Sequence, residues 1–124
     1  MTDPAGLLAS LALSDADLLG DLEDTGPRVG ADTGAPMTRT RVLRDAGALQ
    51  VGIWECTPGG WTVTNRPNTE IVHILHGRAQ ITDADGGGVR ELVAGSVLIL
   101  PIGWSGRWDI SETIRKVYVT VDGL

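Results

Sequence analysis

The 124-residue sequence predicts an all-β domain, an antiparallel jelly-roll barrel, preceded by short N-terminal helices and an extended arm. After position 37, about nine short β-branched and aliphatic runs follow one another at intervals of about 8 to 12 residues, as in sandwiches and barrels. Clusters of Gly, Pro, Asn and Asp separate the runs. No helical periodicity returns between them, so the strands pair with one another rather than with intervening helices.

Composition limits the function classes. A chain of this length forms one domain with one core. The formal charge of −6 argues against nucleic acid or an anionic membrane surface as a partner. The single cysteine, Cys56, allows no internal disulfide and suits a reducing cytoplasm. The first residues lack a basic signal-peptide region, and no apolar run reaches the roughly 20 residues of a membrane span. We therefore expect a soluble, cytoplasmic protein.

Residues 1–36 are expected to form an N-terminal segment outside the main domain. Leucines recur at near-helical spacing up to position 22, and Ser14 with Asp17 resembles a capping box, which together predict one or two short helices. We expect these helices to pack on the outside of the domain or on a partner subunit. Residues 24–36 are rich in turn formers and predict a linker or extended arm. The barrel domain then spans residues 37–124.

The expected strands are the β-branched runs between turn signals. They cover residues 39–44, 49–56, 61–64, 70–75, 78–82, 89–92, 97–100, 107–110 and 115–121. Gly77 separates two of these strands, and residues 83–88 have the composition of a hairpin loop. Large aromatic side chains pack poorly in water, so several of them should line a core or a cavity. The candidates are Trp54, Trp61, Trp104, Trp108 and Tyr118.

One carboxylate stands out because it begins an apolar strand. Glu70 opens the run Glu-Ile-Val-His-Ile-Leu-His-Gly77, and a second apolar run leads into Pro101-Ile-Gly103. A lone buried charge is costly, so the Glu70 side chain must be solvated in a pocket, paired or neutralised. The chain is therefore expected to place an acidic side chain inside a β-rich interior.

These two stretches resemble the two sequence motifs of the cupins. Glu70 with Gly77 resembles the end of the first motif, and Gly95 with Pro101-Ile-Gly103 resembles the start of the second. Four stretches are similar in sequence to the small single-domain cupins grouped with ureidoglycine aminohydrolase: residues 52–59, 70–77, 101–108 and 112–118. The resemblance covers residues 51–121 approximately. It implies a cup-shaped double-stranded β-helix whose mouth binds a small molecule, usually in a homodimer.

The resemblance also implies a metal site that this sequence lacks. Cupins that bind metal place two His before the Glu and a third after the Pro-x-Gly turn, whereas here Val63-Thr-Asn-Arg66 and Gly106 stand at those places. Ile110 stands where the motif often has Asn. Glu70 alone of the usual ligands is present, and a single carboxylate does not hold a transition metal against water. We expect no metal and no other cofactor.

The two histidines do not replace the missing ligands. In a regular strand His73 points to the face opposite Glu70. His76 shares the Glu70 face but lies roughly 20 Å away at about 3.3 Å per residue. We expect His73 on the outer sheet face and His76 in a solvated turn. Cys56 can reach a cavity from its strand, and the alternative is a small buried thiol.

Alternation along the later strands suggests which side chains line the cup. Counting from Gly106 puts Trp108 inside as an apolar wall, with space left at Gly106. On the last strand, Lys116 and Tyr118 share one face and can pair with Glu70, whereas the apolar Val117 and Val119 suggest that the other face is the inner one. This choice stays open. The candidates are Glu70 as the catalytic residue and, for ligand binding, Trp108, Trp61, Lys116, Tyr118 and Cys56.

Two interpretations of Glu70 lead to different functions. In the first, Glu70 is the general acid or base of a metal-independent cupin that binds a small polar metabolite and catalyses an isomerisation, elimination or cyclisation. In the second, Glu70 is a structural carboxylate in a non-catalytic module that binds a metabolite or stabilises a partner. A third alternative, implied by the resemblance, is ureidoglycine aminohydrolase-like amidohydrolase activity. The expected partners are a small-molecule ligand and a second copy of the chain, with no nucleic acid and no membrane.

Overall fold

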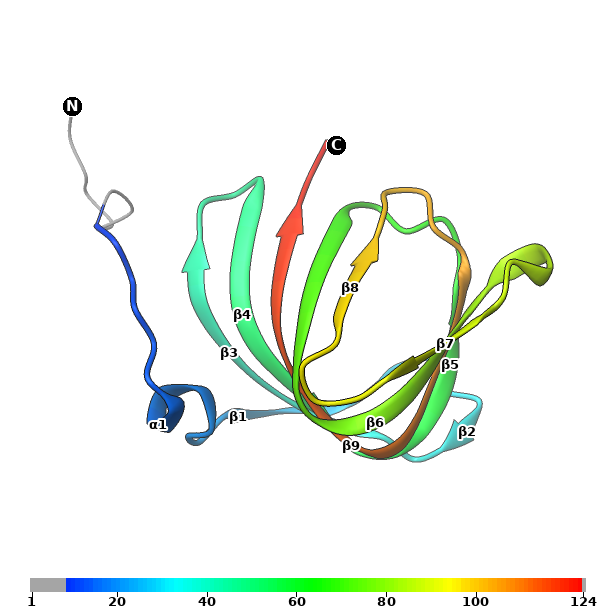
Figure 1. The fold of residues 1–124 in the computed structure, drawn as a ribbon, viewed down its shortest axis with the longest axis horizontal. Helices are drawn as coiled ribbons and strands as arrows, with labels where there is room; N and C mark the ends of the chain where they lie inside the picture. Colours follow the sequence, from blue (N-terminus) through cyan, green and yellow to red (C-terminus); the bar gives the residue numbers. More distant parts are fainter. Residues whose placement is uncertain (1–8, 124) are drawn as a thin grey trace.

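The computed structural model describes residues 9–123, which form one strongly curled antiparallel sheet around a core (Figure 1). The predicted all-β antiparallel barrel is confirmed. In chain order the elements are α1 (Asp15–Leu18), β1 (Glu23–Pro27), β2 (Thr33–Gly34), β3 (Met37–Asp45), β4 (Leu49–Cys56), β5 (Gly59–Val63), β6 (Thr69–Asp83), η1 (Ala84–Gly86), β7 (Val89–Leu92), β8 (Val97–Leu100) and β9 (Gly106–Val121).

The two longest strands, β6 and β9, form a ribbon that runs through both halves of the barrel. They pair from Thr69 with Val121 to Asp83 with Gly106. The other edge of β9 pairs with β4 along its C-terminal half and with β5 along its N-terminal half. β8 and β7 add to the corresponding halves of β6. The two halves of the sheet therefore share one continuous ribbon and enclose the core between them.

The prediction of separate strands on either side of Gly77, and of separate strands at 107–110 and 115–121, is wrong. Both pairs are single strands, because the ribbon bends instead of breaking. The β6–β9 register shifts three times between Ile74 and Ala79, and such bulges bend a strand while the pairing continues. Gly77 has a φ of 100°, and a Cβ there would collide with the Thr113 carbonyl of β9. Glycine is thus required where the two strands approach most closely.

The N-terminal segment contains one short helix within the described residues. The predicted capping box is confirmed, with the Ser14 and Asp17 side chains each bonded to the other residue's backbone. Leu7 and Leu8, which contribute to the predicted helical spacing, lie outside the described residues. Beyond α1, Leu22 is buried, and Arg115 Nη1 donates to the carbonyls of Leu18 and Gly20, so this segment packs on the outer face of β9.

The predicted extended arm runs along the base of the barrel (Figure 1). Its first part, β1, pairs with β3, and its second part, β2, pairs with β5. The arm therefore connects the two halves of the barrel at the end opposite the β3–β4 turn. Among residues 9–123, no helix has the length and apolar character needed to cross a bilayer.

The core lies between the two halves and consists mainly of aliphatic residues with two indoles. Its buried members are Cys56, Trp61, Val72, Ile74, Ala79, Ile81, Leu92, Leu98, Leu100, Trp108, Ile110 and Ile114. β6 and β8 show the alternation expected for strands with one face inside. One end of this interior carries charged groups in place of apolar ones, and these groups form the candidate site.

Candidate functional site

Glu70 lies inside the barrel at the start of β6, and two cations bind its carboxylate. Its side chain is only 7% exposed. Oε2 accepts a hydrogen bond from Lys116 Nζ at 3.1 Å, and Oε1 lies 3.3 Å from Arg66 Nη2. The carboxylate is thus paired on both oxygens, which offsets the desolvation that burial imposes.

Lys116 extends from β9 into the same space, and its ammonium lies between two indole rings. Nζ is 4.4 Å from the ring centroid of Trp54 and 4.8 Å from that of Trp108, distances typical of cation–π contacts. Burial lowers the pKa of Lys116 from its ordinary value, and Glu70 acts in the opposite direction. Lys116 and Tyr118 therefore occupy the inner face of β9, which settles the choice that alternation left open.

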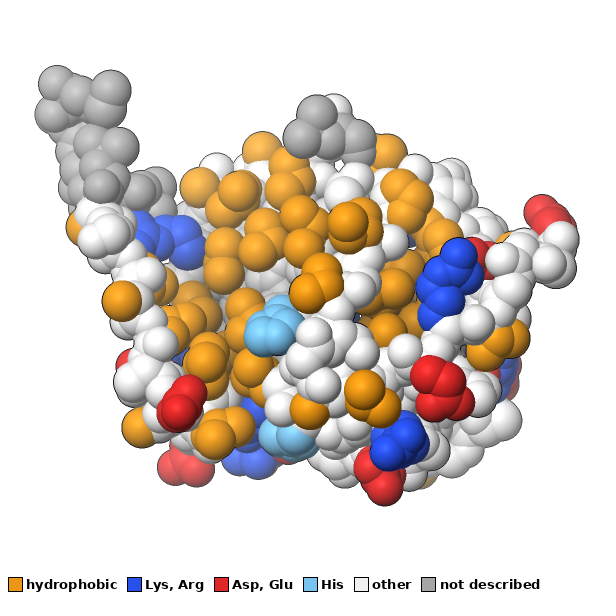
Figure 2. Space-filling model, in the orientation of Figure 1, with side chains coloured by type: hydrophobic (Ala, Val, Ile, Leu, Met, Phe, Trp, Pro, Cys, Tyr) orange, Lys and Arg blue, Asp and Glu red, His pale blue; other side chains and the backbone are white. Residues whose placement is uncertain are grey.

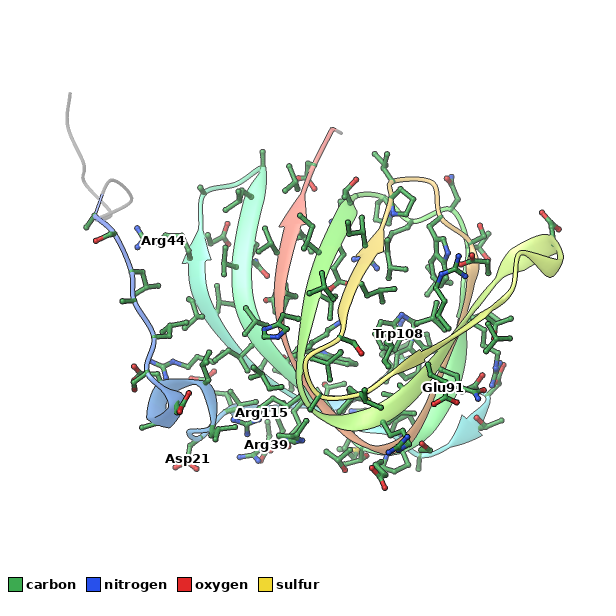
Figure 3. The ribbon with its side chains drawn as sticks, viewed as in Figure 1. Asp21, Arg39, Arg44, Glu91, Trp108 and Arg115 are labelled. Atoms are coloured by element: carbon green, nitrogen blue, oxygen red, sulfur yellow. The ribbon has the colours of Figure 1, made fainter. Side chains whose placement is uncertain are left out.

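Three indoles form a row beside this ammonium, Trp54, Trp61 and Trp108, with Trp61 in the middle. Trp61 and Trp108, opposite each other on β5 and β9, stack with centroids 6.1 Å apart and an interplanar angle of 13°. Trp54 meets Trp61 edge to face at 6.2 Å. The Arg28 guanidinium, from the arm, lies 4.7 Å from the Trp61 ring centroid. Figure 3 shows Trp108 within the cup, as alternation predicts.

The space expected at Gly106 is filled. A Cβ at this position would collide with the Trp104 ring, so the fourth indole takes the room that the missing side chain leaves. Trp104 Nε1 donates to Asp83 Oδ1 at 2.9 Å, which fixes the ring at the end of the ribbon away from Glu70. The cup is therefore not enlarged on this side.

An open cavity of about 210 Å³ lies against the Glu70–Lys116 pair. Its lining comes from the inner faces of β4, β6 and β9: Gln50, Trp54, Glu70, Lys116, Tyr118 and Thr120. Tyr118 donates from its hydroxyl to Gln50 Oε1 at 2.7 Å, and burial raises its pKa. The Tyr118 ring covers Gly52, where a Cβ would lie 2.5 Å from the hydroxyl oxygen. Glycine at this position lets the phenol lie flat against β4.

The predicted site residues divide into three groups. Glu70, Lys116 and Tyr118 line the cavity together. Trp108 touches Lys116, and Trp61 lies behind Trp108. Cys56 is fully buried, its thiol donates to the Thr57 carbonyl, and burial raises its pKa to about 11.

Sequence reasoning missed Arg66, Arg28, Gln50 and Thr120. Arg66 stands four residues before Glu70, within reach of a side chain that must be paired, and that spacing is the signal that could have identified it. Thr120 shares the face of Lys116 and Tyr118 by simple alternation. Arg28 and Gln50 carry no comparable signal, because only the pairing of distant strands brings them near the site.

The histidines lie on the outside of the barrel. His73 is exposed on the outer face, as predicted. The placement of His76 on the Glu70 face is wrong, because the register shift after Ile74 turns it outward. There its Nε2 lies 3.9 Å from Glu55 Oε2, whose carboxylate is held by Arg115. Figure 3 shows Arg115 and Arg39 near the N-terminal segment, on this outer side.

The donors around Glu70 do not fit a transition metal. Within residues 9–123, no three His, Cys, Asp or Glu side chains are grouped to hold an ion. Both Glu70 oxygens already face cations. A metal-activated water, as hydrolysis in metal-dependent cupins would need, has no ligand set in this part of the chain.

Similar solved structures share this fold. A protein of unknown function of the DUF861 family from Pseudomonas syringae superposes with a TM-score of 0.76 at 21% identity, over 85% of this chain and 46% of that one. The EutQ protein of Clostridium difficile gives 0.61 at 20% identity, over 70% and 69%. The polyketide cyclase RemF of Streptomyces resistomycificus gives 0.61 at 18% identity, over 82% and 74%. At these identities the likeness shows the cupin fold alone.

The chain spans less than half the length of the Pseudomonas syringae structure. The comparisons of sequence gave one family. No curated protein matches the chain. These comparisons support the prediction of a small cupin. They do not specifically show the predicted ureidoglycine aminohydrolase-like group. The model of the EutQ-like cupin domain matches residues 43–118, well over half of the sequence, and the chain therefore belongs to the EutQ-like cupin domain family.

Proposed function

We propose that this cupin binds a small polar metabolite in the 210 Å³ cavity and catalyses a proton transfer on it without a metal. The observation that carries the proposal is the Glu70–Lys116 pair in the cavity wall. The pair places a base and an acid 3.1 Å apart, each with a side chain more than nine-tenths buried, next to space that a ligand can enter. Titratable groups with opposite roles in a shared pocket are typical of acid–base sites.

The chemistry follows from the two charges. The Glu70 carboxylate can take a proton from carbon or oxygen of a bound ligand, while the Lys116 ammonium donates a hydrogen bond to the oxygen on which negative charge develops. The lowered pKa of Lys116 makes its ammonium a stronger acid than a solvated one. Arg66 holds the second Glu70 oxygen and orients the carboxylate. Isomerisation, elimination and cyclisation all include such a step.

Incubation in D₂O tests the proposal and requires no identified substrate. A mixture of small metabolites is treated with the wild type or with Glu70→Gln, and mass spectrometry finds compounds that gain deuterium at carbon or change structure. We expect wild-type-dependent labelling that Glu70→Gln abolishes, while circular dichroism shows an intact fold. Glu112→Gln makes the same change at an exposed carboxylate, and as the matched control it should label as the wild type does. Unchanged labelling in Glu70→Gln would remove Glu70 from the mechanism.

A second candidate is a non-catalytic metabolite-binding module. The observation that favours it is that both Glu70 oxygens and the Lys116 ammonium already have partners within the chain, as in a structural ion pair. Ligand-induced stabilisation with no labelling and no product would support this candidate over the enzyme.

We also propose that the chain forms a homodimer through the outer face of β4, β9, β6 and β8. Apolar residues occupy this face in register, with Ile71 between Val119 and Ile99 and with His73 between Val117 and Val97. Val97 and Ile99 are 65% and 63% exposed. Figure 2 shows hydrophobic side chains gathered over this region. A patch with few charges, on a chain of net charge −6, is where two copies meet with least repulsion.

We also propose a cytoplasmic location. The free, buried thiol of Cys56 agrees with a reducing compartment.

A further inference from the structure

The interior around the cavity carries more positive than negative charge. Arg66 and Lys116 share the single carboxylate of Glu70. A third cation, Arg28, lies over Trp61, and no carboxylate of the described residues is within 4 Å of it. A second carboxylate, Asp45, accepts from the Gln50 amide at the cavity wall. Three basic side chains thus lie near two acidic ones, in a chain whose overall charge is −6. The local charge has the opposite sign to that of the whole molecule.

The contacts of these cations show that the surplus is not neutralised within the described chain. Arg66 has a buried Nε without a hydrogen-bond partner. The positive charge of Arg66 repels those of Arg28 and Lys116. Burial is the main cause that lowers the pKa of each, and Arg66 lowers both further. Buried cations in excess are costly unless an anion joins them. The charge of the bare site is therefore suited to a negatively charged ligand.

The cavity offers donors at the place where such an anion would lie. Lys116, Tyr118 and Thr120 alternate along the inner face of β9, so their side chains form one row toward the cavity. Lys116 uses one of its three N–H groups on Glu70, and among the described residues no second hydrogen-bond acceptor is bonded to its Nζ. The Thr120 hydroxyl adds a donor to the same wall, whereas the Gln50 amide already donates to Asp45 Oδ2 at 3.4 Å.

The lining favours a carboxylate over a phosphate. Phosphate groups are usually held by Arg forks or by the backbone N–H groups of a helix N-terminus, and neither lines this cavity. The volume of about 210 Å³ is below the roughly 300 to 1,000 Å³ of pockets for drug-sized ligands, so the occupant is small. The Trp54 ring supplies an apolar wall for its uncharged part.

We propose that the cavity selects small organic carboxylates and binds the carboxylate group through Lys116 and the Thr120 hydroxyl. This rests on the proposed function in that the ligand occupies the same cavity. It goes further by assigning the charge class of the ligand and the residue that recognises it. The Lys116 ammonium then bridges two carboxylates, that of Glu70 and that of the ligand, and the bound anion offsets part of the surplus charge.

Matched acids and amides test the charge class directly. Acetate and acetamide, propionate and propionamide, and benzoate and benzamide are titrated into ¹⁵N-labelled full-length protein, and the indole N–H signals of Trp54 and Trp108 report binding by NMR. We expect each carboxylate to bind about tenfold or more tightly than its amide, as hydrogen bonds to charged groups imply. Inorganic phosphate should bind more weakly than the carboxylates.

Variants then assign the recognition to Lys116. Lys116→Met should bring carboxylate affinity down to that of the amide, and Thr120→Val should weaken carboxylate binding with the Glu70–Lys116 pair left intact. Arg78→Met removes one positive charge from the exposed surface, and it should keep the wild-type preference. Because the comparison of acids with amides needs only the wild type, it decides the question even if Lys116→Met fails to fold.

The outcomes separate this inference from the proposed function. Amides that bind as tightly as carboxylates, or a preference that survives in folded Lys116→Met, would overturn the anion assignment and leave the cavity as a ligand site. Stronger binding of phosphate would replace the carboxylate class with phosphate. A wild type that binds none of these compounds at millimolar concentration would overturn the carboxylate assignment, whereas the proposed function is overturned by the absence of wild-type-dependent labelling in D₂O.

Discussion

At the scale of single residues, position relative to the barrel interior decides the chemistry of each side chain. Glu55 and Glu70 both stand on strands that reach the centre of the fold, yet Glu55 faces outward to Arg115 and His76 whereas Glu70 faces the cavity. Two similar carboxylates thus have different surroundings. The first fastens the N-terminal segment through Arg115, and the second borders the cavity.

Cys56 gives a prediction at this scale. Its pKa of about 11 means that about one molecule in a thousand carries the thiolate at pH 8, and its sulfur is fully buried. Iodoacetamide should therefore leave the native protein unmodified at pH 8 and label it rapidly in urea, as mass spectrometry will show. Labelling of the native protein at the rate of a free thiol would contradict the structure.

The same group has a pH dependence with a definite sign. The thiol pKa is higher in the folded state than the ordinary 9.0, so the folded state binds more protons over that interval. The contribution of Cys56 to stability is complete below about pH 9 and is lost as the pH rises toward 11. Denaturant titrations should show the difference between the wild type and Cys56→Ala narrowing over this range.

The residue-level site was only partly predictable from the sequence. Glu70 could be identified because a carboxylate at the head of an apolar strand must find partners. The partner lysine could not be assigned, because Val117 and Val119 made the wrong face look internal. Both faces of β9 carry apolar and charged residues: one face lines the interior and the other belongs to the outer patch. Alternation identifies which residues share a face, but it does not identify the buried face when both carry apolar residues.

At the scale of elements, Arg107 adds side-chain bonds to the β1–β3 and β2–β5 pairing that holds the arm to the barrel. Arg107 donates to both Asp32 oxygens at 2.8 and 2.7 Å and also binds Asp109, so β2 is tied to β9 across β5. The Asp32 amide continues the attachment with a hydrogen bond to the Gly60 carbonyl. These bonds position Arg28, which lies on the same arm, over Trp61.

Removing this attachment should loosen the arm and leave the barrel folded. In Arg107→Met we expect faster amide hydrogen exchange at Asp32 and faster tryptic cleavage after Arg28. The control is Arg90→Met, which breaks an exposed ion pair with Asp83 on the β6–β7 hairpin. The pKa of Asp32 is lowered by Arg107, so the bond is present at neutral pH and is lost as the pH falls below the ordinary carboxyl range. Equal exchange in both variants would show that the arm is held by other contacts.

Elements were predicted well where turn residues mark their ends and poorly where strands bend. The hairpin loop at residues 83–88 and the strands at 89–92 and 97–100 agree with the structure, because Gly and Pro mark their limits. Gly77 looked like another end, yet it is the point where β6 bends while its pairing with β9 continues. A bulge and a turn have similar local composition, and only the partner strand distinguishes them.

At the scale of the whole molecule, the outer apolar face predicts the state of association. Sedimentation should give twice the 13.1 kDa mass of the chain for the wild type. Ile99→Asp places a carboxylate from each copy in the interface and should give the monomer, since like charges and lost apolar burial both oppose pairing. Val89→Asp, at an exposed position on the β7 hairpin, is the control and should stay dimeric. A wild type that sediments as a monomer at high concentration would refute the dimer.

The row formed by Trp54, Trp61 and Trp108 gives the protein a built-in optical reporter. Trp61 and Trp108 lie nearly parallel and close enough for their excited states to couple, while the Lys116 charge lies against the outer two rings of the row. A ligand that draws this ammonium away changes the electric field on both indoles at once. Emission wavelength and near-ultraviolet circular dichroism can therefore follow occupancy of the cavity in real time, with no added label.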